Sequence, residues 1–294
     1  MIDLSPSPGR SLPASLLLRT DGRCDVDPQR LLDVFGEQRR RFVTVLQGFG
    51  PGDWAAPTRC ADWSAHEVVR HLCDANAIGI AAGPDDGTLD TTVGFDPRTS
   101  PRTWLAASAG ESPGATLGRF VATTGELLAL ARDRLAQGRS FNVRMPYGPM
   151  DWTVLMLHAF WDSWIHERDV LLARGTGHPT DGDATLYATA YGMFIAAAVA
   201  SMFGGQVQER LILGGDGGGI FEVDNRAGIT LTVHRAAGAG PRAAEVADAL
   251  AGRAQIAAAL PELPAGSRTA LSCMADFFHT PAEPRAPDTA PRIN

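Results

Sequence analysis

The stretch FWDSWIHERDV at residues 160–170 holds an acidic side chain and a histidine among apolar neighbours. Asp162 and His166 are four residues apart, so a helix would place both on one face. His71 falls on the apolar face of an earlier predicted helix. Side chains on facing helices can meet in the core of a bundle. Two imidazoles and a carboxylate would suit Zn²⁺ or another divalent ion, and three protein ligands would leave a coordination position open for catalysis.

A simpler interpretation of the same spacing needs no metal. Asp162 and His166 could pair with each other or satisfy another buried polar group, because buried polar side chains need hydrogen-bond partners. A single histidine on an apolar face is more often such a core residue than a metal ligand. The spacing alone leaves both interpretations open.

Three further polar residues lie near these positions and could assist them. His158 precedes Asp162 by one helical turn and could line a pocket. Asp169 and Glu67 could orient the ligand imidazoles through their free N–H groups. A surface salt bridge for Asp169 and a helix cap for Glu67 are equally good interpretations.

Basic and thiol side chains also flank the candidate ligands. Arg70 and Arg168 could bind an anionic substrate, although surface ion pairing is the safer expectation. Cys60 and Cys73 lie near the site in sequence, but free buried cysteines usually pack as small apolar residues. We therefore predict no cysteine nucleophile.

Apolar periodicity and capping residues predict the helices that carry these side chains. Asp27-Pro28 is a helix start, Ser64 and Glu67 form a capping box, and Asp151 is a further N-cap. We expect helices at about 27–50, 64–82, 113–136, 151–174 and 183–203. Residues 83–111 are predicted to form a long loop, which in a compact domain is often functional.

The pattern changes after residue 204, where ERLILGG, GIFEVDN and GITLTVH predict short strands joined by glycine-rich turns. GGDGGG at 214–219 is interpreted as a hairpin turn, because it lacks the GxxxxGK pattern of a phosphate loop. Two helical segments follow. The expected fold class is α+β, with a helical bundle before a small α/β domain. The expected divisions are an irregular lead-in at 1–26, the bundle at 27–180, the C-terminal domain at 181–280 and a disordered tail at 281–294.

Composition narrows the classes of function. The chain has 294 residues and a net charge of −7, which argues against nucleic acid or an anionic membrane as the main partner. All 26 basic residues are arginine, which excludes a lysine Schiff base and a Walker-type lysine. The four cysteines are scattered, which favours reduced thiols and a cytoplasmic location. Residues 186–203 approach the length of a membrane span, but we expect a buried helix there.

Two segments carry a family resemblance: TRCADWSAHEVVRHLCD at 58–74, and PYGPMDW followed by DSWIHERDVLLARG within 146–175. Together they resemble the mycothiol-dependent maleylpyruvate isomerase family, within the DinB-like four-helix metalloenzymes. The resemblance implies a four-helix bundle that binds a divalent metal, usually zinc, with His71, Asp162 and His166 as ligands. Asp162 stands where the family commonly has the longer glutamate. It also implies mycothiol as the thiol cofactor or cosubstrate.

The expected function is therefore that of a metal-dependent enzyme using a low-molecular-weight thiol on a small-molecule substrate. Metal coordination favours the thiolate, which is the nucleophilic form. The reaction would be cis–trans isomerisation of an activated alkene or S-transfer to an electrophile. Two alternatives remain open: a non-catalytic binding or regulatory module on the same bundle, and a metal-dependent hydrolase without a thiol. We expect a monomer or a homodimer.

Overall fold

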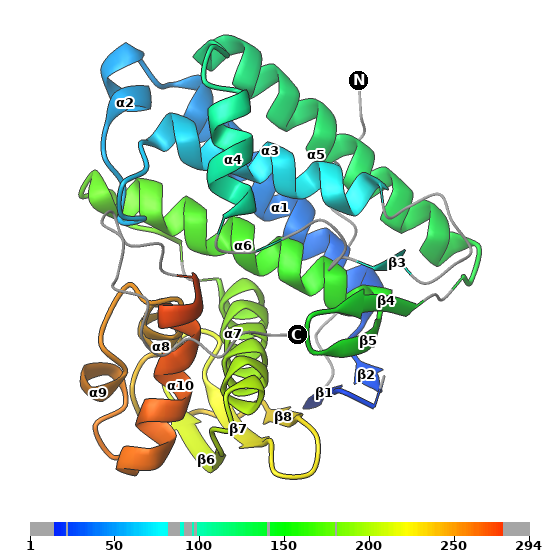
Figure 1. Cartoon of the computed structure of the whole chain (residues 1–294), viewed down its shortest axis with the longest axis vertical. Coiled ribbons are helices and arrows are strands. Elements are labelled where there is room, and N and C mark those ends of the chain that lie inside the picture. Colours follow the sequence, from blue (N-terminus) through cyan, green and yellow to red (C-terminus); the bar gives the residue numbers. More distant parts are fainter. Residues whose placement is uncertain are drawn as a thin grey trace.

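The computed structural model describes residues 15–21, 23–81, 89–90, 96, 99–139, 142–179 and 181–278. Long helices form one half of the molecule, and a sheet with its covering helices forms the other (Figure 1). This arrangement confirms the predicted α+β fold, with a helical N-terminal region before a sheet-containing C-terminal part.

Four long helices form the bundle: α1 (Pro28–Gln47), α3 (Ala65–Ala81), α5 (Pro113–Ala136) and α6 (Trp152–Ala173). Both α1 and α3 pack against α5 and α6. The short helices α2 (Pro51–Ala55) and α4 (Ser100–Ala107) both contact α3. α6 is buried on nearly all sides, so any polar side chain on its inner faces is surrounded by protein.

The predicted caps position these helices. The Asp27 side chain accepts hydrogen bonds from two backbone N–H groups at the start of α1. Ser64 and Glu67 form the reciprocal capping box at the start of α3, with the Ser64 N–H donating to Glu67 at 2.8 Å. Asp151 accepts from the Thr153 N–H at 2.9 Å and so caps α6.

The segments on either side of α5 contain more regular structure than the sequence indicated. The predicted loop at 83–111 includes α4 and the two-residue strand β3 (Leu89–Asp90). Pro101 lies in the first turn of α4, where proline is compatible with a helix. β3 pairs in parallel with β4 (Asn142–Met145), which forms an antiparallel hairpin with β5 (Gly148–Asp151). Residues 144–152 (RMPYGPMDW) therefore contain the end of β4, the turn of the hairpin, β5 and the first residue of α6.

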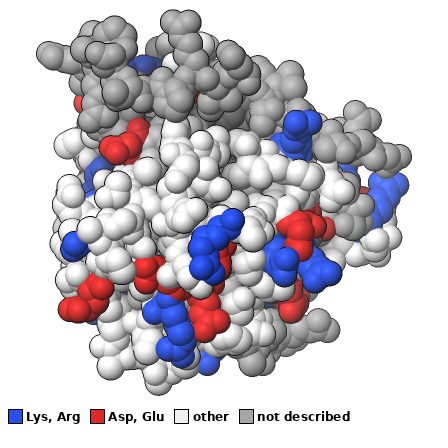
Figure 2. Space-filling model, turned by 60° about the horizontal axis from the view of Figure 1, so that its bottom comes forward, with Lys and Arg blue, Asp and Glu red and all other residues white. Residues whose placement is uncertain are grey.

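The C-terminal half is built on a five-stranded antiparallel sheet in the order β2-β1-β8-β7-β6. Its later elements are α7 (Gly182–Met202), β6 (Gln208–Leu213), β7 (Gly219–Asp224), β8 (Thr230–His234), α8 (Ala243–Leu250), α9 (Ile256–Ala259) and α10 (Ala265–Phe278). Figure 2 shows the sheet end of the molecule, where acidic and basic side chains are interspersed among uncharged ones. Two exposed ion pairs of this sheet are Arg210–Glu222 and Arg226–Asp224.

Helix α7 joins the two halves. It packs against α6 on one side and against β7, β8, α8 and α10 on the others. An 18-residue window of α7 is apolar enough to cross a membrane, but 89% of that window is buried inside the fold. The burial is that of a core helix. One hydrophobic core runs through both halves and includes Phe35, Phe160, Tyr187 and Leu231.

The glycine-rich segment between β6 and β7 is the predicted hairpin turn. Gly217 has φ of +75°, and a Cβ at this position would lie 2.6 Å from the backbone nitrogen of Leu186. Both the left-handed conformation and the close approach of α7 therefore require glycine.

The prediction of an irregular lead-in at 1–26 is wrong where the structure has two strands, β1 (Ser15–Arg19) and β2 (Cys24–Asp25). β1 pairs with β8 along its whole length, so an N-terminal strand completes the C-terminal sheet. Leu16 and Leu18 are buried while the alternate residues are half-buried, as the two-residue repeat of a strand requires. The apolar run is too short to predict a strand by itself, and its pairing partner lies more than 200 residues away. The predicted tail at 281–294 lies outside the described residues.

Candidate metal centre

The three residues selected by spacing meet at one point in the bundle. His71 comes from α3, and Asp162 and His166 come from successive turns of α6. His71 Nε2 lies 3.3 Å from Asp162 Oδ2, and His166 Nε2 lies 3.4 Å from Asp162 Oδ1. One potential ligand atom from each residue lies within 4.8 Å of the others. The two imidazoles meet edge to face, with centroids 5.1 Å apart.

This donor set fits a divalent metal ion. Asp162 Oδ2 is buried and accepts no hydrogen bond of good geometry, which is costly for a carboxylate oxygen unless another partner is present. Burial raises the pKa of Asp162, but the nearby His71 and His166 outweigh burial and hold that pKa well below its usual range. An ionised carboxylate and two imidazole nitrogens are donors that zinc accepts. The shorter arm of aspartate still reaches both imidazoles.

Asp169 supports His166 from the other side of its ring. Asp169 Oδ2 lies 3.1 Å from His166 Nδ1, while His166 Nε2 faces Asp162. Arg253 donates to the Asp169 carboxylate at 2.7 and 2.9 Å. Burial raises the pKa of Asp169, but the contacts from His166 and Arg253 lower it to about 2. A carboxylate in this position fixes the orientation and tautomer of a metal-ligating imidazole.

The other residues considered from sequence have structural roles away from the three donors. Glu67 caps α3 rather than orienting an imidazole. Arg70 donates to the backbone oxygen of Leu105 at 2.9 Å. Arg168 pairs with Asp248 at 2.5 and 3.0 Å. Both arginines are buried, so the expectation of surface ion pairs is wrong, and neither lines the cavity beside the site.

A cavity of about 320 Å³ opens beside the three donors, between the bundle and the C-terminal half. His71, Asp162 and His166 form part of its wall. The remaining wall comes from the turn at 59–63, α3, α4, the β4–β5 hairpin, α6, α7, the turn at 251–253 and α10, and it is mostly apolar. The donors therefore face a space large enough for a small molecule.

Comparison with known proteins supports the resemblance. Residues 35–171 match the family model described as the mycothiol maleylpyruvate isomerase N-terminal domain. The matched residues include most of the bundle, which is therefore similar to that N-terminal domain. This confirms the resemblance stated from the two sequence segments.

The fold likeness extends beyond the residues that match the family model. The crystal structure of a histidine-to-alanine mutant of the mycothiol-dependent maleylpyruvate isomerase superposes with a TM-score of 0.55 at 14% sequence identity. The match covers 78% of this chain and 91% of that one. At this identity the likeness shows a shared fold alone. A search of curated proteins finds no match.

An aromatic ring and a thiol, those of Trp63 and Cys60, lie beside the candidate metal centre. The Trp63 ring lies 5.0 Å from the His71 ring and 5.9 Å from the His166 ring, measured between centroids. Cys60 forms a second potential ligand group with His166 and Asp169. Burial raises the pKa of the Cys60 thiol to about 12, so without a metal it stays protonated at neutral pH. The sequence placed Cys60 near the site but did not indicate its proximity to both His166 and Asp169, because Cys60 lies in a turn with no periodic relation to their helix.

His158, one turn before Asp162 on α6, lines the cavity as expected. Its Nδ1 lies 2.9 Å from the Tyr191 hydroxyl, which lies 2.8 Å from the Tyr147 hydroxyl. In this row of three side chains, both hydroxyl groups donate a hydrogen bond if Tyr147 donates to Tyr191 and Tyr191 donates to His158 Nδ1. Burial lowers the pKa of His158, which favours the neutral ring. The proton of that ring is then on Nε2, which has no hydrogen bond to another described residue.

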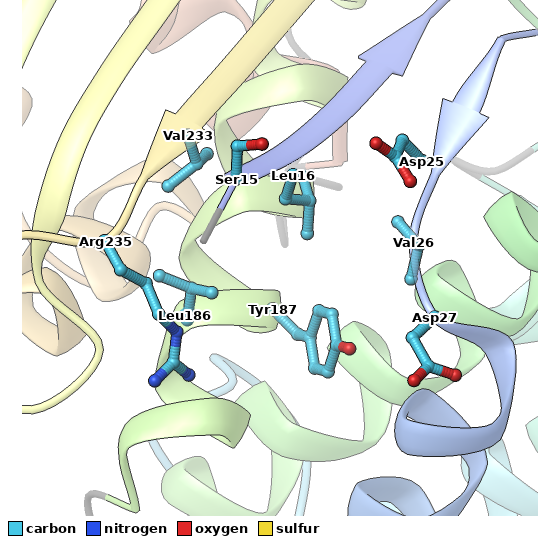
Figure 3. Close-up of a pocket in the computed structure, with 9 residues that line it drawn as sticks. All are labelled: Ser15, Leu16, Asp25, Val26, Asp27, Leu186, Tyr187, Val233 and Arg235. Carbon is cyan, nitrogen blue, oxygen red and sulfur yellow. The ribbon is translucent and has the colours of Figure 1, made fainter. Parts of the chain in front are cut away.

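A second pocket is far smaller, about 10 Å³, and lies where β1, β2 and α7 meet (Figure 3). Tyr187 projects into it between Leu186 and Asp27 (Figure 3), and its buried hydroxyl has no partner among the residues described. A space of this size holds about one water molecule. None of the three candidate metal ligands lines this pocket, and it is too small for a substrate.

Proposed function

We propose that the chain is a metal-dependent enzyme that uses a low-molecular-weight thiol, mycothiol, on a small electrophilic substrate. The reaction is isomerisation of an activated alkene or S-transfer to the electrophile. The observation that carries the proposal is the convergence of His71, Asp162 and His166 on one point in the wall of a large cavity. The family model named for mycothiol maleylpyruvate isomerase supports the choice of thiol.

The proposed ligands are His71 and His166 through imidazole nitrogens and Asp162 through its carboxylate, with zinc as the ion. Bound there, the ion would supply a Lewis acid that favours the thiolate form of a bound thiol. Three protein ligands leave room for such an exogenous group, as in catalytic zinc sites.

The remaining residues of the site orient groups and exclude water. Asp169 holds the His166 ring, and Arg253 holds Asp169. Trp63 packs beside both imidazoles and limits their motion. His158 can present an Nε2–H donor to a substrate oxygen, because Tyr191 occupies its Nδ1. The apolar wall keeps the reacting groups out of bulk water, where a thiolate is solvated and a hydrogen bond is weaker.

The four cysteines are free, which is consistent with the proposed cytoplasmic location. The hydrolase alternative uses the same metal ligands but no thiol. Adding a thiol to the cobalt-substituted protein, as described below, therefore distinguishes it from the thiol-dependent enzyme. The binding-module alternative would show neither metal-dependent thiol binding nor turnover.

A cobalt-substituted protein tests the proposal directly. Cobalt(II) takes the same ligand types as zinc, and a coordinated thiolate produces a charge-transfer absorption that carboxylate and imidazole ligands do not. We expect this absorption to appear when mycothiol is added to the wild-type protein and to be absent in His71→Ala. His234→Ala is the control, because His234 is exposed at the end of β8. Cobalt binding without any change on adding thiol would reject the thiol function and leave the hydrolase.

A further inference from the structure

The cavity wall contains two chemically different groups of side chains. One group consists of the three candidate metal ligands and His158. The other group consists of aliphatic and aromatic side chains from several elements, including Ile78, Leu155, Ile165, Ile195, Val199 and Phe277. A surface of this kind gains free energy from burying apolar ligand groups and loses it when a charged group is desolvated.

The arginines among the described cavity-wall residues are poor partners for a buried carboxylate, because they are already paired or exposed to solvent. Arg253 already donates to Asp169 through two of its nitrogens and to the Ala251 backbone oxygen through the third. Arg59 pairs with Asp248 at 3.2 Å. Arg102 is the third basic residue of this wall, and its side chain is exposed to solvent. A dianionic substrate would therefore lose its hydration without gaining a buried, unpaired arginine among the described wall residues, and the open position on the proposed metal ion is assigned to the thiol.

The polar groups that remain are neutral. His158 Nε2 is free of bonds to other described residues, and the Tyr147 hydroxyl is held by Tyr191. One neutral donor beside the metal centre matches one accepting oxygen on a ligand, such as a carbonyl or ester oxygen.

We propose that the substrate of this site is a neutral, largely apolar electrophile with one hydrogen-bond-accepting group near its reactive carbon. A small dicarboxylate such as maleylpyruvate, the substrate in the name of the structural neighbour, fits this wall poorly. The accepting oxygen lies toward His158, and the apolar part lies against α7 and α10. This proposal rests on the proposed function, because it names the substrate class of the same cavity.

A matched series of saturated ligands tests the substrate class without any reaction. Succinate, dimethyl succinate and dibutyl succinate share one carbon chain, differ in charge and apolar length, and do not react with thiols. Dissociation constants are measured with the protein as purified by the change in tryptophan fluorescence, because Trp63, Trp104 and Trp161 line the cavity. We expect dimethyl succinate to bind at least tenfold more tightly than succinate. Each additional buried methylene of the dibutyl ester should tighten binding by up to about fourfold.

Two surface substitutions show whether the ligands occupy this cavity. Met202 lines it and is 37% exposed, so Met202→Arg should fold normally. The variant should bind dibutyl succinate less tightly and succinate more tightly. Ile212, which is 47% exposed on β6 and does not line the cavity, provides the control Ile212→Arg with unchanged affinities.

Three results would overturn the proposal: succinate binding as tightly as its dimethyl ester, no gain from the longer ester, or equal effects of the two arginine substitutions. The titration contains no thiol, so its outcome is separate from that of the cobalt test. A protein that binds no thiol can still prefer the diesters, and a confirmed thiol enzyme can still prefer the dicarboxylate.

Discussion

Replacing Asp169 with asparagine tests whether metal binding at the proposed centre depends on the carboxylate that holds His166. The amide keeps the shape of the side chain but removes the charge that orients His166 and pairs with Arg253. Loss of such a supporting carboxylate typically weakens metal binding by about 10- to 100-fold, or about 1.4–2.7 kcal/mol. We expect zinc affinity to fall within that range, measured at neutral pH by competition with a chromophoric chelator.

The same substitution should also lower the free energy of unfolding. The Asp169 side chain is fully buried and that of Arg253 is 19% exposed, so the variant leaves a largely buried guanidinium without its counter-charge. Breaking a buried ion pair from one side costs about 3–5 kcal/mol, and the partial exposure of Arg253 places the expected loss near about 3 kcal/mol. Urea unfolding of the metal-free protein measures this value.

Asp248→Asn is the matched control for both measurements. Asp248 is also buried and pairs with two arginines, Arg168 and Arg59, but it contacts none of the proposed ligands. We expect a similar loss of stability with zinc affinity unchanged. Unchanged zinc affinity in Asp169→Asn, or an equal loss of affinity in both variants, would refute the role assigned to Asp169.

Three further substitutions test the fold and the hydrogen-bond chain. Leu18→Ala should lower the free energy of unfolding by about 2–5 kcal/mol, because Leu18 is fully buried where β1 joins the sheet; a loss below about 1 kcal/mol would contradict that packing. Gly217→Ala should cost at least about 1 kcal/mol, because alanine is strained at this positive φ and its Cβ would meet the backbone of α7; unchanged urea unfolding would contradict the close approach. Tyr191→Phe removes the hydroxyl that fixes the tautomer of His158. ¹⁵N NMR should therefore show the Nε2–H tautomer in the wild type and a mixture of tautomers in the variant. Identical spectra would reject the hydrogen bonds assigned to Tyr147, Tyr191 and His158.

The site was predictable from sequence where it depends on helical periodicity. Asp162 and His166 are one turn apart on α6, and His71 lies on the buried side of a helix whose capping box marks its start. Because facing helices in a bundle have few ways to pack, spacing along each helix predicted that the three side chains could meet, whereas their assignment as metal ligands depended on the family resemblance. Because the side chain of Asp162 is shorter than that of glutamate, the sequence left its contact with the two histidines uncertain. The distances of 3.3 Å to His71 and 3.4 Å to His166 show that the Asp162 carboxylate reaches both imidazoles.

Features that depend on contacts between distant segments were not predictable. β1 pairs with β8 from the other end of the chain, and its short apolar run carries no signal of that partner. Arg253 follows α8, 84 residues after Asp169, and only the docking of the two halves brings them together. Tyr191 looked like one more residue of an apolar helix, but its hydroxyl meets His158 across the α6–α7 contact.

The metal content of the purified protein, determined by elemental analysis beside His166→Ala, tests the central claim most directly. The account predicts about one zinc or similar divalent ion per chain in the wild type and its loss in the variant. His234→Ala should retain the ion. No metal in the wild-type protein after zinc is added, or full retention by His166→Ala, would contradict the account and leave Asp162 and His166 as a polar pair in the bundle core.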